Sequence, residues 1–378
     1  MTPNPLITEA IDRLCRSEAL SAQETTAVLR EVMEGRASYV QTAGLLIAFR
    51  TKGETVDELA GMARAMRELA VPVRPAATDL VDTAGTGGGR PTFNVSTTAA
   101  LVAAGAGCRV AKHGNRSATG QSGSADVLEA LGARIDLEPE AVMRCIDELG
   151  FGFMFAPHHH PAMKHVVPVR KELAVRTIFN FLGPLTNPAG ATRQLIGVSD
   201  NRFLDIVAGA LGELGCEHAL VVSSDDGLDE LSISAPTRVV ELRDGRLEAH
   251  RVTPESVGLA GAPQTAVAAG TPEKNAGVAR RVLDGGPGAE RDLTALNAGA
   301  AIYVGGRADS IEHGVRVAEE AIDSGAARDV LERFVSRTRE EAGGGAQPER
   351  EGRSAAGTSF RRAPHPGLSG EHPTGGSP

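Results

Sequence analysis

The first 75 residues carry apolar positions at the spacing of an α-helix. Between residues 59 and 69 these positions recur every three or four residues, which places them on one helix face. Ser21 with Glu24, and Thr55 with Glu58, have the spacing of a capping box, in which two side chains satisfy free backbone N–H groups at a helix start. Segment 1–75 therefore predicts a small N-terminal all-helical domain.

From about residue 78 short apolar runs alternate with helical segments. The predicted strands are 80–81, 109–111, 151–155, 195–198 and 219–223. The predicted helices are 95–106, 125–131, 203–214, 273–284, 310–324 and 326–341. This alternation is typical of a large α/β domain with a mostly parallel central sheet flanked by helices, and we assign it residues 76–342. Two further runs flank Asp244-Gly245 and predict a hairpin at the periphery of the sheet.

The segment 343–378 differs from the rest of the chain in composition. Of its 36 residues, nine are Gly and five are Pro, and its large apolar residues are Phe360 and Leu368. Such a segment buries too little apolar surface to offset the entropy of ordering it. We therefore predict a disordered tail.

Composition narrows the function. The chain has 378 residues and a net charge of −9, so a broad nucleic-acid-binding surface is not expected. Its four cysteines include no Cys-x-x-Cys pair, which argues against zinc ribbons and thioredoxin-like chemistry and favours reduced core thiols. No stretch has about eighteen consecutive apolar residues, so no membrane span is expected. We expect a cytoplasmic protein that binds neither nucleic acid nor membrane.

A glycine-rich turn, Gly85-Thr86-Gly87-Gly88-Gly89, follows the predicted strand 80–81. Glycines let backbone N–H groups approach an anion closely, and a turn after a parallel strand lies at the edge where α/β proteins bind ligands. Arg90 stands where a dinucleotide fingerprint needs its last glycine, and the Gly-Lys-Ser/Thr ending of a P-loop is absent. A purely structural turn is the alternative.

Two more polar segments follow this turn. Residues 94–97, Asn-Val-Ser-Thr, stand at a predicted helix start, where free N–H groups and polar side chains attract anions. Residues 112–116, Lys-His-Gly-Asn-Arg, supply two cations, and Thr119, Gly120 and Ser124 follow before the next helix. The alternatives are an ordinary helix cap and a solvated basic loop. Together with the glycine turn, these segments predict a site for a multiply phosphorylated small molecule.

Asp229 and Glu230 are adjacent carboxylates in a loop after the predicted strand 219–223. Mg²⁺ usually takes one or two carboxylates together with substrate phosphates and waters, so the pair is a candidate magnesium site. An exposed acidic loop is the alternative. Arg170 stands beside Pro- and Gly-rich sequence, and its planar guanidinium suits a two-pronged grip on a carboxylate. Surface ion pairing is the alternative for this arginine.

Together these motifs resemble the anthranilate phosphoribosyltransferase family. GTGG, NVST, KHGNR, GSADVLEALG, HPAMKHVVPVRKELAVRTIFNFLGPLTNPA and GLDE occur in the family's order and spacing over about residues 5–340. The resemblance implies that the phosphoribosyl group of 5-phosphoribosyl-1-pyrophosphate (PRPP) is transferred to the amine of anthranilate, releasing pyrophosphate, in tryptophan biosynthesis. It also implies a fold similar to that of pyrimidine nucleoside phosphorylases, with residues 166–187 rejoining the helical domain, and a homodimer formed through that domain.

The resemblance also implies roles for residues of this sequence. PRPP would contact Gly85, Gly88, Gly89, Thr92, Asn94, Val95, Ser96, Thr97, Lys112, His113, Gly114, Asn115, Arg116, Thr119, Gly120 and Ser124. Anthranilate would contact Gly85, His113, Asn115, Arg170 and Pro184, with Arg170 on its carboxylate. Two Mg²⁺ ions per subunit are implied, with Ser96 as a ligand of one and Asp229 and Glu230 as ligands of the other. Two positions depart from the family's usual sequence: a single Gly89 precedes Arg90 where Asp-Gly is common, and Gly120 replaces a serine.

The implied chemistry is a displacement at the anomeric carbon of the ribose. Because an aromatic amine is already neutral at pH 7, no general base is assigned, and charge stabilisation by Lys112, Asp229 and Glu230 should dominate together with positioning. Two alternatives are a pyrimidine nucleoside phosphorylase of the same fold and a non-catalytic phosphate-sensing protein. Arg170 and the Asp229-Glu230 pair argue against the phosphorylase, because they suit a carboxylate substrate and a magnesium-bound pyrophosphate.

Overall fold

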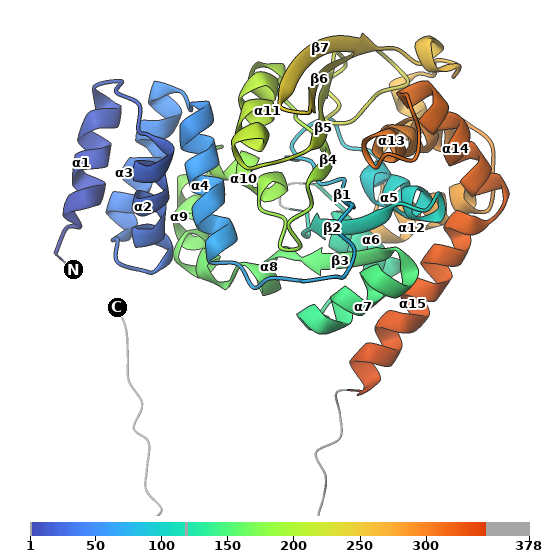
Figure 1. Ribbon diagram of the computed structural model, residues 1–378, viewed down its shortest axis with the longest axis horizontal. Coiled ribbons are helices and arrows are strands. Elements are labelled where there is room, and N and C mark those ends of the chain that lie inside the picture. The colour runs from blue at the N-terminus through green and yellow to red at the C-terminus, as the bar shows by residue number, and fades with distance from the viewer. Residues whose placement is uncertain (1, 118–119, 345–378) are drawn as a thin grey trace, which may run out of the picture. The chain divides into compact units, whose positions relative to one another are not determined.

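The computed structural model describes residues 2–117 and 120–344, and four helices open the chain (Figure 1). They are α1 Pro5–Cys15, α2 Ala22–Met33, α3 Tyr39–Lys52 and α4 Val56–Glu68. Both expected capping boxes form, because the Ser21 and Thr55 side chains accept the N–H groups of Glu24 and Glu58, whose carboxylates bond back. The predicted all-helical start of the chain is confirmed.

A seven-stranded sheet follows, in the order β3-β2-β1-β4-β5-β6-β7. The strands are β1 Leu80–Asp82, β2 Arg109–Gly114, β3 Phe151–Phe155, β4 Arg193–Gly197, β5 His218–Ser224, β6 Thr237–Arg243 and β7 Arg246–Val252. Strands β1 to β5 pair in parallel, and β6 and β7 extend the sheet antiparallel. The predicted α/β class is therefore confirmed. The predicted hairpin is confirmed as well, with Asp244 and Gly245, both at positive φ, leading into β7 at the sheet edge.

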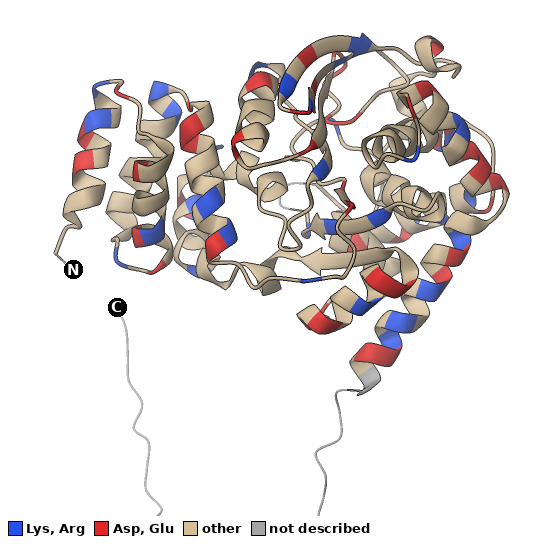
Figure 2. Cartoon of the chain, in the orientation of Figure 1, with Lys and Arg blue, Asp and Glu red and all other residues tan. Residues whose placement is uncertain are grey.

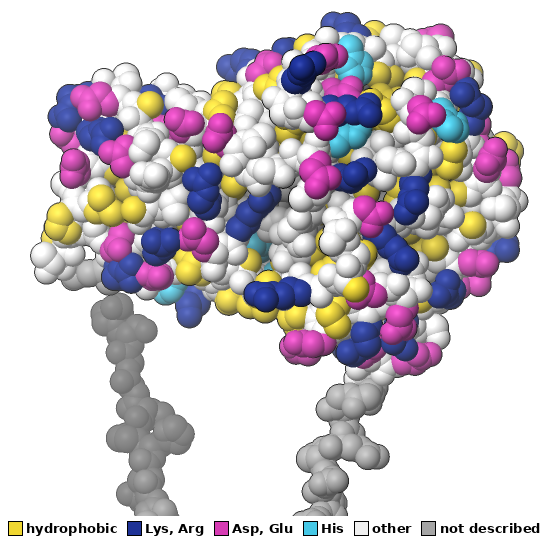
Figure 3. All heavy atoms as spheres, viewed as in Figure 1, with side chains coloured by type: hydrophobic (Ala, Val, Ile, Leu, Met, Phe, Trp, Pro, Cys, Tyr) yellow, Lys and Arg dark blue, Asp and Glu magenta, His cyan; other side chains and the backbone are white. Residues whose placement is uncertain are grey.

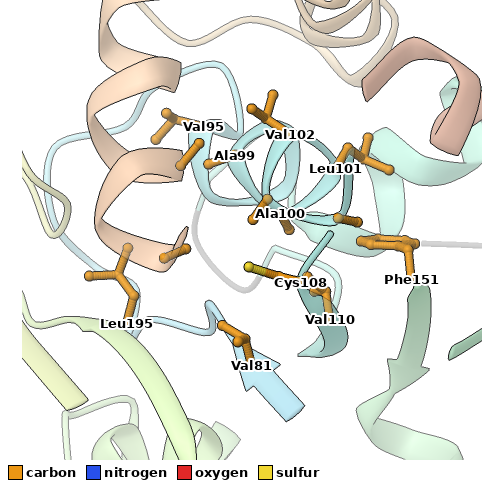
Figure 4. Packing of buried hydrophobic residues seen from close by; sticks show 14 of the residues in the cluster. Val81, Val95, Ala99, Ala100, Leu101, Val102, Cys108, Val110, Phe151 and Leu195 are labelled. Atoms are coloured by element: carbon orange, nitrogen blue, oxygen red, sulfur yellow. The ribbon is translucent and has the colours of Figure 1, made fainter. Parts of the chain in front are cut away.

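Helices cover both faces of this sheet. The remaining α-helices are α5 Val95–Gly105, α6 Ser124–Ala130, α7 Pro139–Leu149, α8 Ala156–His159, α9 Val167–Leu173, α10 Phe179–Leu185, α11 Leu204–Glu213, α12 Pro272–Leu283, α13 Ala289–Val304, α14 Ile311–Asp323 and α15 Ala326–Gly344. Leu195 and Leu220 join a core with α5 and α13, part of which Figure 4 shows. Their sequence neighbours Ile196 and Val221 join a second core with α4 and α11. Successive strand residues point to opposite faces, so one sheet serves two cores.

Helices α9 and α10 pack on α1–α4, and we call this group of six helices the helical bundle (Figure 1). Val169 and Leu182 lie in the same apolar cluster as the buried residues of α1–α4. An ion pair inside the bundle joins α3 to α4, where Lys52 Nζ lies 2.9 Å from the Glu58 carboxylate and both side chains are almost fully buried. The Leu20 N–H donates to the second Glu58 oxygen at 3.0 Å. The domain boundary at residue 75 stays a prediction.

Several elements differ from the sequence expectation. α7 and α13 were not predicted, and α13 is buried at almost every position from Leu293 to Val304, so its sequence lacks a polar face. β2 continues three residues beyond the predicted strand, to Gly114. α15, which carries acidic and basic residues along its length (Figure 2), runs to Gly344 and so includes the first two residues of the predicted tail. Residues 345–378 lie outside the described part of the chain. Among the described helices, none is long and apolar enough to cross a membrane.

Candidate functional site

The loops after β1, β2, β4 and β5 meet at one edge of the sheet, because parallel strands end on the same side. From β1 the chain moves outward to β2 and β3, and then returns to place β4 on the other side of β1. Such a reversal is where α/β proteins bind ligands. The loop after β1 is joined to the end of β4 by the Thr86 N–H, which donates to the Gly197 carbonyl at 2.8 Å.

The glycine turn packs directly on the loop after β5. Gly88 has a φ of +84°, and a side chain at Gly89 would lie 2.7 Å from the backbone nitrogen of Asp229 and would collide with its carboxylate. Gly85 lies next to Gly197, whose carbonyl would be 3.2 Å from an added Cβ. The turn therefore needs glycine because the backbone and the Asp229 carboxylate occupy the space of its side chains.

The start of α5 is held by a hydrogen-bond network. Asn94 has a φ of +67°, and its amide nitrogen donates to the Ser122 carbonyl at 2.9 Å. Its amide oxygen accepts the Ser122 hydroxyl at 2.7 Å and the Asn275 amide at 2.8 Å. Val95 and Thr97 are buried, and Thr92 forms a β-bridge with Ala268. The Asn94 side chain is thus committed to protein partners, and Asn275, which no sequence motif indicated, belongs to the site's support.

Lys112 corrects the expectation that residues 112–116 form a loop. Lys112, His113 and Gly114 belong to β2 and pair with β3, and Lys112 is 1% exposed. Its ammonium donates to the Thr83 hydroxyl at 2.9 Å and to the Thr83 carbonyl at 3.2 Å. Burial lowers the pKa of Lys112, and the negative charges of Asp82 and Glu230 oppose that shift. The solvated-loop alternative is therefore wrong for this lysine.

Asp82, at the end of β1, is a buried acid that the sequence analysis did not select. Its carboxylate accepts the His113 N–H at 3.2 Å and the Asn187 amide at 2.7 Å. Burial raises the pKa of Asp82 to about 6 against the opposing attraction of Lys112. The sequence signal for Asp82 as a site residue is an acid that ends an apolar strand just before a glycine turn.

Asp229 and Glu230 are partly buried and lack cationic partners within 4 Å among the described residues. Burial raises the pKa of both, and for Glu230 the adjacent Asp229 charge raises it further. A hydrogen bond from Ser96 lowers the pKa of Glu230. Because a cation would relieve this cost, the pair fits Mg²⁺ better than it fits an exposed acidic loop. The described residues contain no cluster of three or more His, Cys, Asp or Glu side chains that could hold a metal.

His113 lies against α10, and its Nδ1 is 3.0 Å from the Gly183 carbonyl, next to the buried Pro184. The His160 ring is 5.2 Å away. Burial, followed by the effect of His160, lowers the pKa of His113 to about 3. His113 is therefore uncharged at pH 7 and offers an aromatic wall beside Pro184.

Arg170, on α9, forms no ion pair among the described residues, so surface ion pairing is wrong for it. Its guanidinium lies 5.6 Å from the centre of the Phe179 ring. Burial lowers the pKa of Arg170, which reflects the electrostatic cost of an unpaired charge at this place. A carboxylate ligand would compensate that charge.

The loop after β2 is organised by Asp126 of α6, which accepts the N–H groups of Ser117 and Gly123 at 3.1 and 2.8 Å. Arg116 points to α6, where it pairs with Asp126 at 2.8 Å and Glu129 at 2.5 Å. Asn115 is exposed, and its side chain accepts the Arg116 N–H at 2.7 Å. Gly120 and Ser124 lie in this loop and at the start of α6, while Thr119 lies outside the described residues.

The structure brings some of the sequence-selected residues together: Gly89 contacts Asp229, Ser96 contacts Glu230, and Ser96 and Lys112 both contact Thr83. The others contact residues outside this set; these others are Gly85, Gly88, Asn94, His113 and Pro184. Arg116 also contacts residues outside this set, because two acids of α6 hold its guanidinium. The result is a charged, partly buried group at the switch point of the sheet, formed by the glycine turn, the buried ammonium of Lys112 and the acid pair.

Comparison with known proteins agrees with this arrangement. Residues 77–328 match the α/β-domain model of a glycosyl transferase family, and residues 8–70 match its helical bundle domain. The anthranilate phosphoribosyltransferase of Rubrobacter xylanophilus is 54% identical over 343 residues, which cover 90% of this chain and 100% of that protein.

Solved structures extend the comparison. The anthranilate phosphoribosyltransferase of Thermus thermophilus superposes with a TM-score of 0.83 at 49% identity, covering 87% of this chain and 99% of that one. The Saccharomyces cerevisiae enzyme in complex with PRPP and Mg superposes with a TM-score of 0.80 at 26% identity, covering 88% and 98%. Sequence identity and fold agree, and the chain belongs to the anthranilate phosphoribosyltransferase family.

Proposed function

We propose that the protein transfers the phosphoribosyl group of PRPP to the amine of anthranilate, giving N-(5-phosphoribosyl)anthranilate and pyrophosphate, a step of tryptophan biosynthesis. The observation that carries the proposal is that one chain has both a magnesium-type acid pair at the glycine turn and, on α9, an arginine without an ion pair among the described residues. The first suits a pyrophosphate, and the second suits the carboxylate of the acceptor. The relatives support neither the phosphorylase nor the phosphate-sensing alternative.

The phosphate end of PRPP would lie along the glycine turn and the starts of α5 and α6. Backbone N–H groups of the turn and of residues 95–97 are suited to phosphate oxygens. Lys112 would add positive charge from beneath, because its ammonium is fixed to Thr83. Arg116 would contribute only through its backbone, because Asp126 and Glu129 hold its guanidinium.

Mg²⁺ is the cofactor that fits the acid pair, and a structure of the yeast relative contains Mg together with PRPP. We propose two ions, one held by Ser96 and one by Asp229 and Glu230. When bound, Mg²⁺ neutralises the charge that develops on the departing pyrophosphate. The protein's own part is to hold these oxygen ligands partly buried, where their charge attracts a cation strongly.

The anthranilate pocket would be formed by Gly85, His113, Asn115, Arg170 and Pro184. Arg170 would hold the carboxylate and so aim the amine at the anomeric carbon. His113, neutral because of its low pKa of about 3, would line the aromatic face without competing for that carboxylate. No base is required, because the aromatic amine carries its lone pair at pH 7. Positioning and fixed charge therefore supply the catalysis.

A homodimer formed through the helical bundle is part of the proposal. On its helices α1 and α3, four large apolar side chains are exposed, Leu6, Tyr39, Val40 and Ile47, and Val40 is 82% exposed. Figure 3 shows hydrophobic side chains among charged ones on the bundle, at the left of the view. An exposed group of this kind on adjacent helices α1 and α3 suits contact with a second copy. The cytoplasmic location stays a prediction.

The test is the loss of anthranilate fluorescence on adding PRPP, with and without Mg²⁺. We expect turnover that depends on Mg²⁺, and Arg170→Ala should raise the KM for anthranilate much more than the KM for PRPP. Folded protein that leaves the fluorescence unchanged would exclude the proposed activity. Equal effects of Arg170→Ala on both KM values would exclude its carboxylate role alone.

A further inference from the structure

Arg176 lies in the short segment between α9 and α10 and is held from the helical bundle. Ala174, at a φ of +51°, ends α9 and turns the chain toward the sheet. The Arg176 carbonyl accepts Nη1 of Arg50, on α3, at 2.7 Å. The backbone at Arg176 is therefore tied to a helix that is 126 residues earlier in the chain.

The side chain of Arg176 reaches the glycine turn. Its Nη2 donates to the Gly87 carbonyl at 2.9 Å. The guanidinium also lies against Gly88, where an added Cβ would be 2.9 Å from Cζ and would collide with Nη2. The charge of Arg176 lowers the pKa of Asp229 and so acts against the effect of burial. One exposed arginine thus contacts the turn and lowers the pKa of Asp229.

Arg176 is poorly satisfied in this position. A guanidinium has five N–H donors, and the hydrogen bond to Gly87 uses one of them with a neutral acceptor. Among the described residues no carboxylate lies within 4 Å of it, whereas Arg90 pairs with Asp226 at 2.9 Å. Other cations near the turn are committed: Lys112 is buried on Thr83. The other donors of Arg176 therefore have no carboxylate partner among the described residues, although the guanidinium lies at the turn.

We propose that Arg176 binds the pyrophosphate part of PRPP from the side of the helical bundle, and that Arg50 is a positioning residue that holds Arg176 there. This inference rests on the proposed function, which places pyrophosphate at the glycine turn. A planar guanidinium can give two parallel hydrogen bonds to a phosphate, which a neutral carbonyl does not match. Arg176 therefore serves the donor substrate, while Arg170, six residues earlier, serves the acceptor.

The test compares Arg176→Ala and Arg176→Lys with Arg246→Ala, a control on the exposed edge strand β7. The KM values for PRPP and anthranilate come from anthranilate fluorescence, and the Kd of inorganic pyrophosphate with Mg²⁺ comes from calorimetry. Arg176→Ala should raise the PRPP KM and the pyrophosphate Kd about tenfold or more, as for a lost charge-assisted bond. The anthranilate KM should stay within about twofold, the lysine variant should lie between, and the control should match wild type.

Arg50→Ala tests the positioning role. It should raise the PRPP KM less than Arg176→Ala does, and it should add nothing in the Arg176→Ala background, because the two residues act as one unit. Additive effects would overturn the role of Arg50. A PRPP KM and a pyrophosphate Kd within twofold of wild type for both Arg176 variants would overturn the role of Arg176. Wild-type protein without turnover would instead refute the proposed function, and the pyrophosphate Kd would still decide whether Arg176 binds that anion.

Discussion

Replacing Asn94 with alanine perturbs a point where three segments join. The Asn94 side chain makes three hydrogen bonds, two with Ser122 in the loop after β2 and one with Asn275 in α12, at 2.7 to 2.9 Å. Its backbone stands at a φ of +67°, a conformation that costs alanine more than it costs asparagine. The change therefore removes side-chain bonds and strains the backbone at the same residue.

The free-energy cost of the substitution follows from these two effects. Three hydrogen bonds contribute roughly 1 kcal/mol each, and a left-handed alanine adds about 1 kcal/mol of strain. The closed arrangement of the loops should lose about 4 kcal/mol in Asn94→Ala and about 3 kcal/mol in Asn94→Gly, because glycine tolerates positive φ. The loops can open without unfolding the rest, so much of the loss should appear as a higher KM for PRPP. Each 1.4 kcal/mol that PRPP must supply raises that KM about tenfold.

The assay is the PRPP KM of Asn94→Ala and Asn94→Gly, measured by anthranilate fluorescence and accompanied by hydrogen exchange of the loop after β2. Both variants should show a higher KM and faster exchange, with alanine worse than glycine. A PRPP KM within twofold of wild type for both variants would show that the network does not organise the loops. An alanine variant no worse than glycine would refute the strain argument alone.

Three further changes test other parts of the structure. Gly89→Ala should displace the Asp229 carboxylate and raise the Mg²⁺ concentration that gives half-maximal turnover, and it should lower thermal stability because the added Cβ also meets the Asp229 backbone. Glu58→Ala should lower the free energy of unfolding in urea by about 3–5 kcal/mol, because it leaves a lysine charge buried without its partner. Acid should destabilise the fold through His113 and His160, whose folded pKa values of about 3 and 4 lie below the usual 6.5. The unfolded chain then binds more protons, so stability falls as pH drops below about 6.5, by roughly 1.4 kcal/mol per pH unit for each histidine.

Each of these three predictions has a result that would contradict it. Normal Mg²⁺ dependence in Gly89→Ala would mean that the Asp229 carboxylate is not a metal ligand, and a loss under 1 kcal/mol in Glu58→Ala would mean that water reaches Lys52. Asp82 changes stability with pH in the direction opposite to the histidines, because its folded pKa, about 6, is raised above the ordinary value. The difference in pH slope between wild type and His160→Gln therefore isolates the histidine, and equal slopes would contradict its burial as a neutral group.

Local signals were sufficient for much of the fold. Capping pairs, strand-then-turn order and the Asp-Gly hairpin act through neighbours in sequence, so the N-terminal helices, the parallel sheet and its peripheral hairpin could be predicted. α13 could not, because a helix that is buried on nearly all sides has no polar face to mark its period. The end of strand β2 was also mispredicted, because a lysine usually marks an exposed position. Lys112 can be buried in β2 because Thr83 and Asp82, which are distant in sequence, compensate its charge.

The candidate site was predictable in location more than in detail. Turns after successive parallel strands must meet at one edge, so the glycine turn, the loop after β2 and the acid pair could be expected there together. The partners of each side chain could not be predicted, because they come from far along the chain. Asn275 bonds Asn94 across 181 residues, and Arg176 reaches Gly87 across 89. The roles of the individual residues in binding PRPP, anthranilate and Mg²⁺ remain predictions that the variants above test.

The return of α9 and α10 to the helical bundle has a consequence for biosynthesis. The core of α1–α4 includes side chains from α9 and α10 and from strands as late as β6. A nascent chain of 75 residues therefore has all four N-terminal helices but lacks the residues that cover them. Its apolar faces stay uncovered on the ribosome until much of the sheet has emerged. The segment that is made first is thus among the last to complete its core, and until about residue 242 has emerged its uncovered apolar faces favour aggregation.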